Sequence, residues 1–258
     1  MIEAQKLTKI FDGKKALNGV DIKINSGSIY GLVGSNGSGK STLLRLISGI
    51  YKPDGGSITI DGNSVFNNAE IKAGISYLGD TPYFLPGATI NETAKFYRSM
   101  YKNFDNALFH RLLEIFPLDY KAKIAAMSKG MQRQAALITA VAASPRYLLL
   151  DGLDAVIRKT LKRILIEGAE NRSMTAVIAS HNVKELEDLC DHVGLIHNGN
   201  VLFNDETEAL KGRLHKLQAA FRRVPELSAF SGLDIVKTER SGSVINMVVR
   251  GNEDEILS

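Results

Sequence analysis

A glycine-rich octapeptide between two apolar segments constrains this chain more than any other feature. Residues 34–41 read Gly-Ser-Asn-Gly-Ser-Gly-Lys-Ser, which satisfies the pattern G-x-x-x-x-G-K-[ST]. Residues 28–33 form a mostly apolar strand-like run, and residues 40–50 carry leucine and isoleucine at helical spacing. An ordinary glycine-rich turn is the alternative, but the pattern arises by chance in only about 0.02 of such chains. The sequence therefore predicts a strand, a phosphate-binding loop and a helix.

The residue types of this loop suit a nucleoside triphosphate. Glycines let successive backbone N–H groups converge on phosphate oxygens, and the following helix start adds its positive dipole end. We expect Lys40 to face the β and γ phosphates and the Ser41 hydroxyl to ligate Mg²⁺. The predicted ATP-binding residues of the loop are Gly34, Ser35, Asn36, Gly37, Ser38, Gly39, Lys40, Ser41 and Thr42.

The rest of the chain alternates short apolar runs with longer helical patterns, which predicts an α/β fold with a parallel sheet. Near the N-terminus, alternating segments separated by Asp-Gly and Ser-Gly turns predict a small antiparallel β subdomain. Three helical patterns with no strand between them predict an inserted helical subdomain at about residues 87–143. The expected fold is thus an α/β P-loop NTPase core with two subdomains.

The pattern changes near residue 211, so we expect a main domain over residues 1–210 and a small C-terminal extension over residues 211–258. The extension is predicted to begin with a helix, followed by strands at residues 232–236 and 244–250. The apolar face of that helix would consist of Leu210, Leu214, Leu217 and Phe221. Its basic side chains fit a solvated face, contact with anionic headgroups or contact with a partner protein.

The overall composition indicates an ordinary globular protein. Hydrophobic residues make up 44% and charged residues 23%, and the longest apolar run, Ala135–Ala143, is too short to span a bilayer. The start lacks a signal-peptide layout, and the single cysteine, Cys190, is expected to be a buried thiol. We therefore expect a cytoplasmic chain. The net charge of +4 is too weak to indicate nucleic-acid binding.

Three further motifs follow the glycine-rich loop in an order that resembles the ATP-binding subunit of ABC transporters, over roughly residues 2–210. Residues 127–133 (Met-Ser-Lys-Gly-Met-Gln-Arg) resemble the family signature. Residues 147–151 (Tyr-Leu-Leu-Leu-Asp) resemble the Walker B strand, and residues 179–181 (Ala-Ser-His) resemble the switch histidine. Each motif is short, but four of them in the family's order and spacing are very specific.

The resemblance implies an ATPase that uses ATP and Mg²⁺ to power a separate transmembrane permease, without nucleic acid as a partner. It implies a second ABC nucleotide-binding subunit, either identical or a paralogue, paired head to tail with this one. Ser128 and Gly130 would then close on the γ-phosphate held by the other subunit. Through the permease, the chain would lie on the inner face of the cell membrane. The Ser-Lys-Gly-Met variant of the signature resembles export-type subunits.

Four single residues have a functional interpretation, and three of them also have an ordinary one. Asp151 ends an apolar strand, where a carboxylate suits Mg²⁺. His181 precedes a helix predicted over residues 182–189; the resemblance makes it a sensor of the γ-phosphate, although a lone histidine is more often a surface residue. Phe11 stands where the family has an aromatic that stacks on adenine, but a core phenylalanine on an edge strand fits equally. Ser128 also fits a plain helix N-cap.

The chain departs from the family pattern at two places. Asp80 stands where the family usually has glutamine; it can orient water or Mg²⁺ but cannot donate as an amide does, and a turn aspartate is the alternative. After Asp151 the family reads Asp-Glu-Pro-x-x-Gly-Leu-Asp, whereas residues 151–154 read Asp-Gly-Leu-Asp. Gly152, Leu153 and Asp154 resemble the family's dimer-contacting loop. The simplest alignment is therefore a loss of four residues, including the glutamate that polarises the attacking water.

Two rival functions stand beside the transporter ATPase. One is an ATP-gated interaction protein with little or no hydrolysis, which the missing glutamate favours. The other is a soluble ABC ATPase that acts on nucleic acid or ribosomes. We disfavour the latter because such proteins typically fuse two nucleotide domains in one chain, and this chain has one glycine-rich loop of the required pattern.

Overall fold

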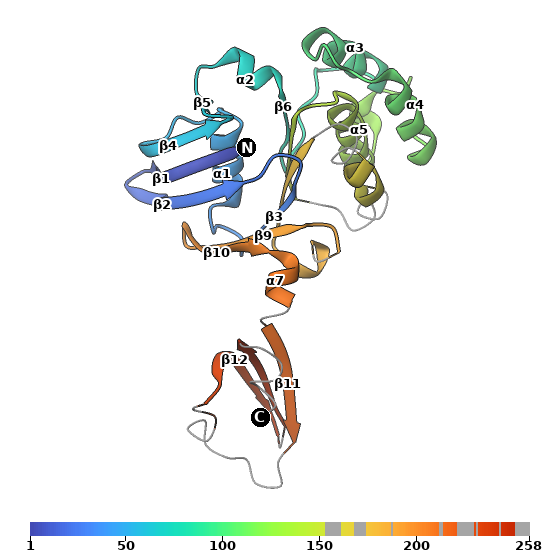
Figure 1. Cartoon of the computed structure of the whole chain (residues 1–258). Coiled ribbons are helices and arrows are strands. Elements are labelled where there is room, and N and C mark those ends of the chain that lie inside the picture. Colours follow the sequence, from blue (N-terminus) through green and yellow to red (C-terminus); the bar gives the residue numbers. More distant parts are fainter. Residues whose placement is uncertain are drawn as a thin grey trace. The chain divides into compact units, whose positions relative to one another are not determined.

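The structure is a computed structural model that divides into two compact units, residues 1–204 and 205–258 (Figure 1). This division lies slightly before the expected boundary at residue 210. The structure describes residues 1–152, 161–167, 174–186, 188–211, 214–220, 230, 232–242 and 244–250.

The N-terminal part forms the antiparallel sheet that the turn pattern predicts. Its strands are β1 (Ile2–Phe11), β2 (Lys14–Ile24), β4 (Gly55–Ile60) and β5 (Asn63–Ser64), in the order β2-β1-β4-β5. Asp12 and Gly13 connect β1 to β2 with φ angles of 48° and 76°, the left-handed pair that a tight hairpin requires. The predicted antiparallel β subdomain is therefore confirmed.

A second sheet forms the centre of the first unit. Its strands are β3 (Ile29–Val33), β6 (Ile75–Leu78), β7 (Tyr147–Asp151), β8 (Thr175–Ser180), β9 (His192–His197) and β10 (Asn200–Glu206), in the order β10-β9-β3-β8-β7-β6. All five strands from β9 to β6 run parallel. Every residue of β3, β7 and β8 is buried, which explains why these segments read as continuous apolar runs.

Helices complete the first unit. They are α1 (Lys40–Ile47), α2 (Ala69–Ala73), α3 (Ile90–Met100), α4 (Asn106–Ile115), the 3₁₀ turn η1 (Ile124–Ala126), α5 (Lys129–Ala142) and the helical residues 161–167. The side chains of Thr89, Asp105 and Ser128 cap α3, α4 and α5 by accepting a backbone N–H. The helical subdomain predicted from the three uninterrupted patterns is thus present, and the α/β fold class is confirmed.

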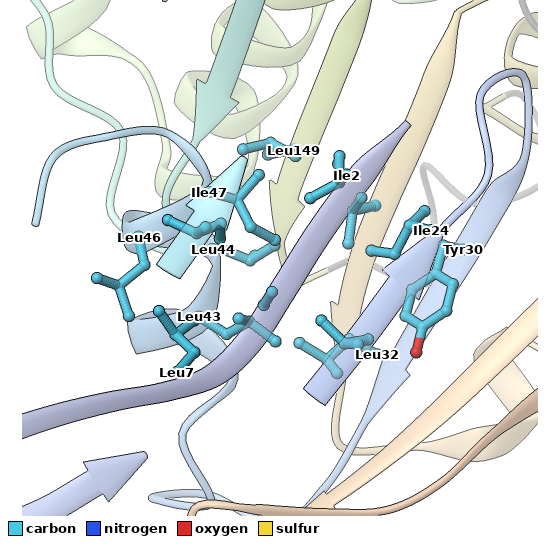
Figure 2. Close-up of a cluster of buried hydrophobic side chains, with 14 of the residues drawn as sticks. Ile2, Leu7, Ile24, Tyr30, Leu32, Leu43, Leu44, Leu46, Ile47 and Leu149 are labelled. Atoms are coloured by element: carbon cyan, nitrogen blue, oxygen red, sulfur yellow. The ribbon is translucent and has the colours of Figure 1, made fainter. Parts of the chain in front are cut away.

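Helix α1 ties the two sheets together. It contacts β2 and β4 of the antiparallel sheet and β7 and β8 of the parallel sheet. Figure 2 shows its leucines, Leu43, Leu44 and Leu46, among side chains from both sheets, including Ile2 and Leu149. Because one buried core anchors α1 from two sides, the loop that precedes the helix is held on a rigid base.

The structure describes residues 182–186, 188 and 189 of the helix predicted over residues 182–189, and these residues do not form a regular α-helix. The structure has a 3₁₀ turn, η2 (Val183–Glu185), followed by further turns, with i to i−3 bonds such as Leu189 N to Leu186 O. Leu186 and Cys190 pack directly on β3, where a Cβ on Gly31 would stand 3.1 Å from each side chain. This close packing, which periodicity does not reveal, takes the place of a regular helix. Cys190 is buried, as expected.

The C-terminal unit contains α7 (Thr207–Lys211) and a three-stranded antiparallel sheet, ordered β11 (Leu214–Ala220), β13 (Val244–Arg250), β12 (Asp234–Ser241). The helix predicted through residues 214–217 is therefore wrong. In β11, Leu217 pairs with Met247 and packs on a small core of Ile245, Met247 and Val249. Pairing with a strand some thirty residues away overrides the local spacing of leucines.

Candidate functional site

The carboxyl ends of four parallel strands meet at one edge of the central sheet. Because β3, β8, β7 and β6 are neighbours in that order, the segments that follow them lie side by side. They border a cleft of about 290 Å³. Its lining residues are Ala16, Asn36, Gly37, Gly39, Lys40, Ser41, Thr42, Asp80, Asp151, Gly152, Ala179, Ser180 and His181.

The glycine-rich loop follows β3 and is packed too closely to carry side chains at two of its glycines. A Cβ on Gly34 would stand 2.3 Å from the carbonyl oxygen of Ile196, and one on Gly39 would stand 2.7 Å from that of Ala16. Gly37 has a φ of 78° and open space around it. The hydroxyl of Ser38 is buried and lacks a hydrogen-bond partner among the described residues. Such a loop is shaped to present backbone N–H groups to a ligand.

Lys40 begins α1 and turns back over this loop. Its Nζ donates to the carbonyl oxygens of Gly34, at 2.7 Å, and Ser35, at 2.9 Å. Burial lowers the pKa of Lys40 from its ordinary value, and the carboxylate of Asp151 acts in the opposite direction. Lys40 also lines the cleft, where a phosphate could replace the carbonyl oxygens as the partner of its ammonium group.

Ser41 and Asp151 place two oxygen atoms together in the cleft. Ser41 Oγ donates to Asp151 Oδ1 at 3.1 Å, although the two residues lie 110 positions apart. Asp151 is only 5% exposed, because it ends the central strand β7. A hydroxyl and a carboxylate fit Mg²⁺, which takes one or two protein oxygens and completes its shell with phosphate and water. No group of three or more His, Cys, Asp or Glu side chains elsewhere in the described segments would hold a metal.

Tyr77, which the sequence analysis did not select, supports this carboxylate. Its hydroxyl donates to Asp151 Oδ2 at 3.3 Å from the neighbouring strand β6. Burial, followed by the negative charge of Asp151, raises the pKa of Tyr77. The phenol therefore stays protonated and donates. An alternating strand pattern around residue 77 would have shown that Tyr77 shares a sheet with Asp151, but not that the two side chains meet.

Arg133 is the second residue that sequence reasoning missed. From α5, its Nη2 donates to the carbonyl oxygens of Asp151, at 3.0 Å, and Gly152, at 3.1 Å, while Nη1 pairs with Asp80 Oδ1 at 3.2 Å. Asp80 itself is 76% exposed in its side chain and lines the cleft. The guanidinium thus links the signature helix to both acidic residues of the site. Leu153 and Asp154, which would begin the dimer-contacting loop, lie outside the described residues.

The remaining predicted site residues fall into two groups. His181 is exposed and lines the cleft after β8. Ser128 and Gly130 are exposed at the start of α5 and do not line it. Ser128 Oγ accepts the N–H of Met131, so the serine is a helix N-cap as well.

Phe11 does not line the cleft. The alternative interpretation of Phe11, as a core phenylalanine on an edge strand, is wrong. Strand β1 is an interior strand of its sheet, and Phe11 is 40% exposed rather than part of the core. Its ring packs edge-on against Tyr51, with centroids 5.4 Å apart, and lies under the Lys9 ammonium. These contacts leave an exposed aromatic surface at the end of β1.

The sequence profile of the ABC transporter family matches residues 17–154, more than half of the chain. The chain belongs to the ABC transporter ATP-binding family. It is 32% identical over 223 residues to the bacitracin transport ATP-binding protein BcrA of Bacillus licheniformis, covering 84% of this chain and 73% of BcrA. It is also 29% identical to the ABC transporter ATP-binding protein YtrB of Bacillus subtilis, covering 99% of this chain and 88% of YtrB.

Solved structures agree with this family fold. The ATP-binding subunit of an ABC transporter superposes with a TM-score of 0.73 at 24% identity, over 82% of this chain and 92% of that one. A dimeric ATP-binding cassette in a post-hydrolysis state, bound to ADP and Pi, superposes with a TM-score of 0.70 at 21% identity, over 80% and 99%. As an ABC ATP-binding subunit, the chain binds ATP and is an ATPase that powers a membrane permease. No helix in the described part of the chain is long and apolar enough to cross a bilayer.

Proposed function

We propose that the 290 Å³ cleft is the ATP site of this ABC subunit and that it works with Mg²⁺. The single observation that carries the proposal is the Ser41–Asp151 hydrogen bond of 3.1 Å beside the Lys40 ammonium. Residues 34–42 would hold the phosphates through backbone N–H groups, and Lys40 would contact the β and γ phosphates. Phe11 would stack on the adenine, because its ring is exposed.

Ser41 and Asp151 would hold the magnesium ion, which neutralises phosphate charge when it is bound. Tyr77 keeps the Asp151 carboxylate oriented by donating to its second oxygen. Asp80 and His181 line the same cleft from the adjacent loops and are the side chains available to contact the γ-phosphate and the attacking water. All of these groups come from the carboxyl edge of one sheet.

We propose further that the working unit is a head-to-tail dimer, with an identical or a paralogous subunit. The exposed N-cap Ser128 and the following Gly130 offer an anion site outside the chain's own cleft. A solved structure with a similar fold, cbiO1 of Clostridium perfringens, is part of the ABC transporter complex cbiONQ. For this chain the corresponding partner would be a transmembrane permease, with the ATPase on its cytoplasmic face.

Hydrolysis by this chain is proposed to be slow. General-base groups contribute about 10²- to 10⁴-fold to a rate, and the residue after Asp151 is a glycine rather than an acid. Gly152 has a φ of +86°, which side chains rarely adopt. ATP binding would therefore survive, while turnover would fall below about 1 per second, a rate at the low end for enzymes.

The binding site is tested by titrating the purified protein with ATP in the presence of Mg²⁺ or EDTA. Lys40→Ala is expected to weaken ATP binding at least about tenfold in both conditions, because it removes a charge-assisted contact. Ser41→Ala should weaken binding mainly when Mg²⁺ is present. A control, Lys95→Ala in exposed α3, should bind as the parent does. Unchanged ATP affinity in Lys40→Ala would show that the cleft is not the nucleotide site.

A further inference from the structure

Arg133 is held more firmly than the acidic residue with which it pairs. Its side chain is 22% exposed, and its guanidinium is fixed by three acceptors at 3.0 to 3.2 Å. A guanidinium is planar and presents its donors in a rigid fork, so three acceptors define its place and its plane. Arg133 therefore acts as a fixed point next to the cleft.

Asp80 depends on that fixed point for its position. It stands on a loop two residues beyond β6, and its side chain is 76% exposed. An exposed carboxylate on a loop samples several rotamers unless a partner selects one. Within the described residues, the cation that pairs with Asp80 is Arg133, at 3.2 Å. The ion pair keeps the carboxylate on the side of the loop that faces the cleft.

Gly152 makes room for this arrangement. A Cβ at this position would stand 2.8 Å from Arg133 Nη2 and 3.6 Å from Asp80 Oδ1. The guanidinium and the Asp80 carboxylate thus occupy the space beside the residue that follows Asp151. An acidic side chain is missing after Asp151 in the sequence, and an acidic side chain from another loop stands near that place in the structure.

We propose that Arg133 is a positioning residue for ATP hydrolysis, and that it holds the Asp80 carboxylate where it orients the attacking water. This inference rests on the proposed ATP site. In the step, the water oxygen bonds to the γ-phosphorus, and the bond from that phosphorus to the bridging oxygen breaks. ADP leaves with the electron pair, and Asp80 accepts the water proton, which it then releases to solvent.

The test compares nucleotide binding, a single turnover of γ-labelled ATP, and folding in the full chain. Arg133→Gln is expected to slow the single turnover by about 10- to 100-fold, the cost of a misplaced catalytic group. ATP affinity, with Mg²⁺ or with EDTA, should change by less than about threefold, because Arg133 does not line the cleft. Arg133→Lys should recover part of the rate. Arg111→Gln breaks a different ion pair, Arg111–Glu167, and should leave the rate unchanged.

A double mutant separates positioning from a general structural effect. If Arg133 acts through Asp80, adding Arg133→Gln to Asp80→Asn should slow the reaction by less than about twofold beyond Asp80→Asn alone. In protein without nucleotide, the two substitutions should also be non-additive in the free energy of unfolding. If circular dichroism shows that Arg133→Gln is unfolded, Arg133→Lys replaces it in the comparison of rates and in the comparison of unfolding free energies.

Several results would overturn the inference. These are equal rates for Arg133→Gln and the parent, fully additive rate effects with Asp80→Asn, or loss of ATP affinity that matches the loss of rate. If the unsubstituted protein binds ATP but shows no measurable single turnover, the inference about Arg133 is also wrong, although the proposed ATP site is still supported. A parent that fails to bind ATP would instead refute the proposed function itself.

Discussion

At the scale of single residues, this site is built by backbone geometry as much as by charge. The position after Asp151 suits glycine for two reasons. Its φ is +86°, and the lack of a Cβ leaves room for Arg133. The two carbonyl oxygens that Arg133 contacts, those of Asp151 and Gly152, belong to this same corner. The corner is therefore adapted to glycine and not merely short of a glutamate.

Replacing Gly152 alone by glutamate should not restore fast ATP hydrolysis. Gly152→Glu is expected to lower the free energy of unfolding by about 1–3 kcal/mol, because it places a side chain in a left-handed conformation against Arg133. It should not raise the ATPase rate. Gly62→Glu, at a φ of +78° with open space around it, controls for backbone strain alone and should cost less. A stable Gly152→Glu protein with a tenfold faster turnover would contradict this account.

Inserting a four-residue segment after Asp151 should raise the rate of ATP hydrolysis, which the single substitution should not do. A Glu-Pro-Ala-Ala insertion after Asp151 supplies both the acid and the loop length of the family pattern, and it should raise turnover by at least about tenfold. The matched Gln-Pro-Ala-Ala insertion changes the loop equally without adding a carboxylate. Equal rates for the two insertions would show that loop length, rather than the base, limits hydrolysis.

Asp61 makes stability depend on pH. Burial acts to raise the pKa of its carboxyl, but hydrogen bonds from the Met1 amino group and the Tyr147 hydroxyl outweigh burial and lower it. A lowered folded-state pKa gives stability that is present above the unfolded value of about 3.9 and is lost as the pH falls through the folded value. Asp61→Asn should therefore destabilise the protein by about 1–3 kcal/mol at pH 7. In urea unfolding curves the difference from the parent should shrink below about pH 4, and a constant difference would refute the assignment.

At the scale of elements, α5 and β11 show two ways in which a segment gains its role. Helix α5 carries Ser128 at its N-cap and Arg133 beyond its first turn, so one helix contributes to the proposed anion site and to the contacts beside the chain's own cleft. Strand β11 is instead defined by its partner, β13, and by the small core of Ile245, Met247 and Val249. Among the described residues, the buried core of this sheet is Ile245, Met247 and Val249, so we expect each of these side chains to matter.

Met247→Ala should therefore unfold the C-terminal sheet selectively. Removing this buried side chain costs about 2–5 kcal/mol, a large share of what a core of this size can supply. Hydrogen exchange followed by mass spectrometry should show loss of protection in β11, β12 and β13, while ATP affinity is kept, because the cleft residues all lie in residues 1–204. Val65→Ala, in the core of the first unit, should give the reverse pattern of lost protection. Helix-like exchange across residues 214–220 would contradict the strand.

At the scale of the whole molecule, the residues of the proposed ATP site lie in two separate places on one chain. The loop, Lys40 and Asp151 line the cleft, whereas Ser128 and Gly130 are exposed outside it. A second subunit that brings its signature to this cleft would complete the site. The solved ATP-binding cassette that forms a dimer with ADP and Pi has a similar fold, and the similarity covers 80% of this chain.

ATP should therefore drive dimerisation. Light scattering is expected to show a doubled mass with ATP and Mg²⁺, provided that the partner is identical, and a monomer with EDTA. Gly130→Ala should block the change but not the fold, since the nearest side-chain atom to its Cβ in the described part of the chain would be Ser128 Oγ, at 4.0 Å. Ser128→Ala loses an N-cap as well, so Thr89→Ala, which removes the cap of α3, is its matched control. A monomeric parent that has ATP bound at high concentration would point to a paralogous partner.

The sequence by itself determined the α/β class, the phosphate loop, the order of the family motifs and the hairpin turn at Asp12-Gly13, because these depend on local patterns of glycine, charge and apolar periodicity. Tertiary structure alone decided the contacts of Tyr77 and Arg133, which join residues 74 and 18 positions apart through adjoining elements. It also decided that residues 214–220 form a strand and that residues 183–185 form a 3₁₀ turn, because pairing and packing with distant segments outweigh weak local preferences. Local patterns record what a segment can form, and only the folded chain shows which distant groups it meets.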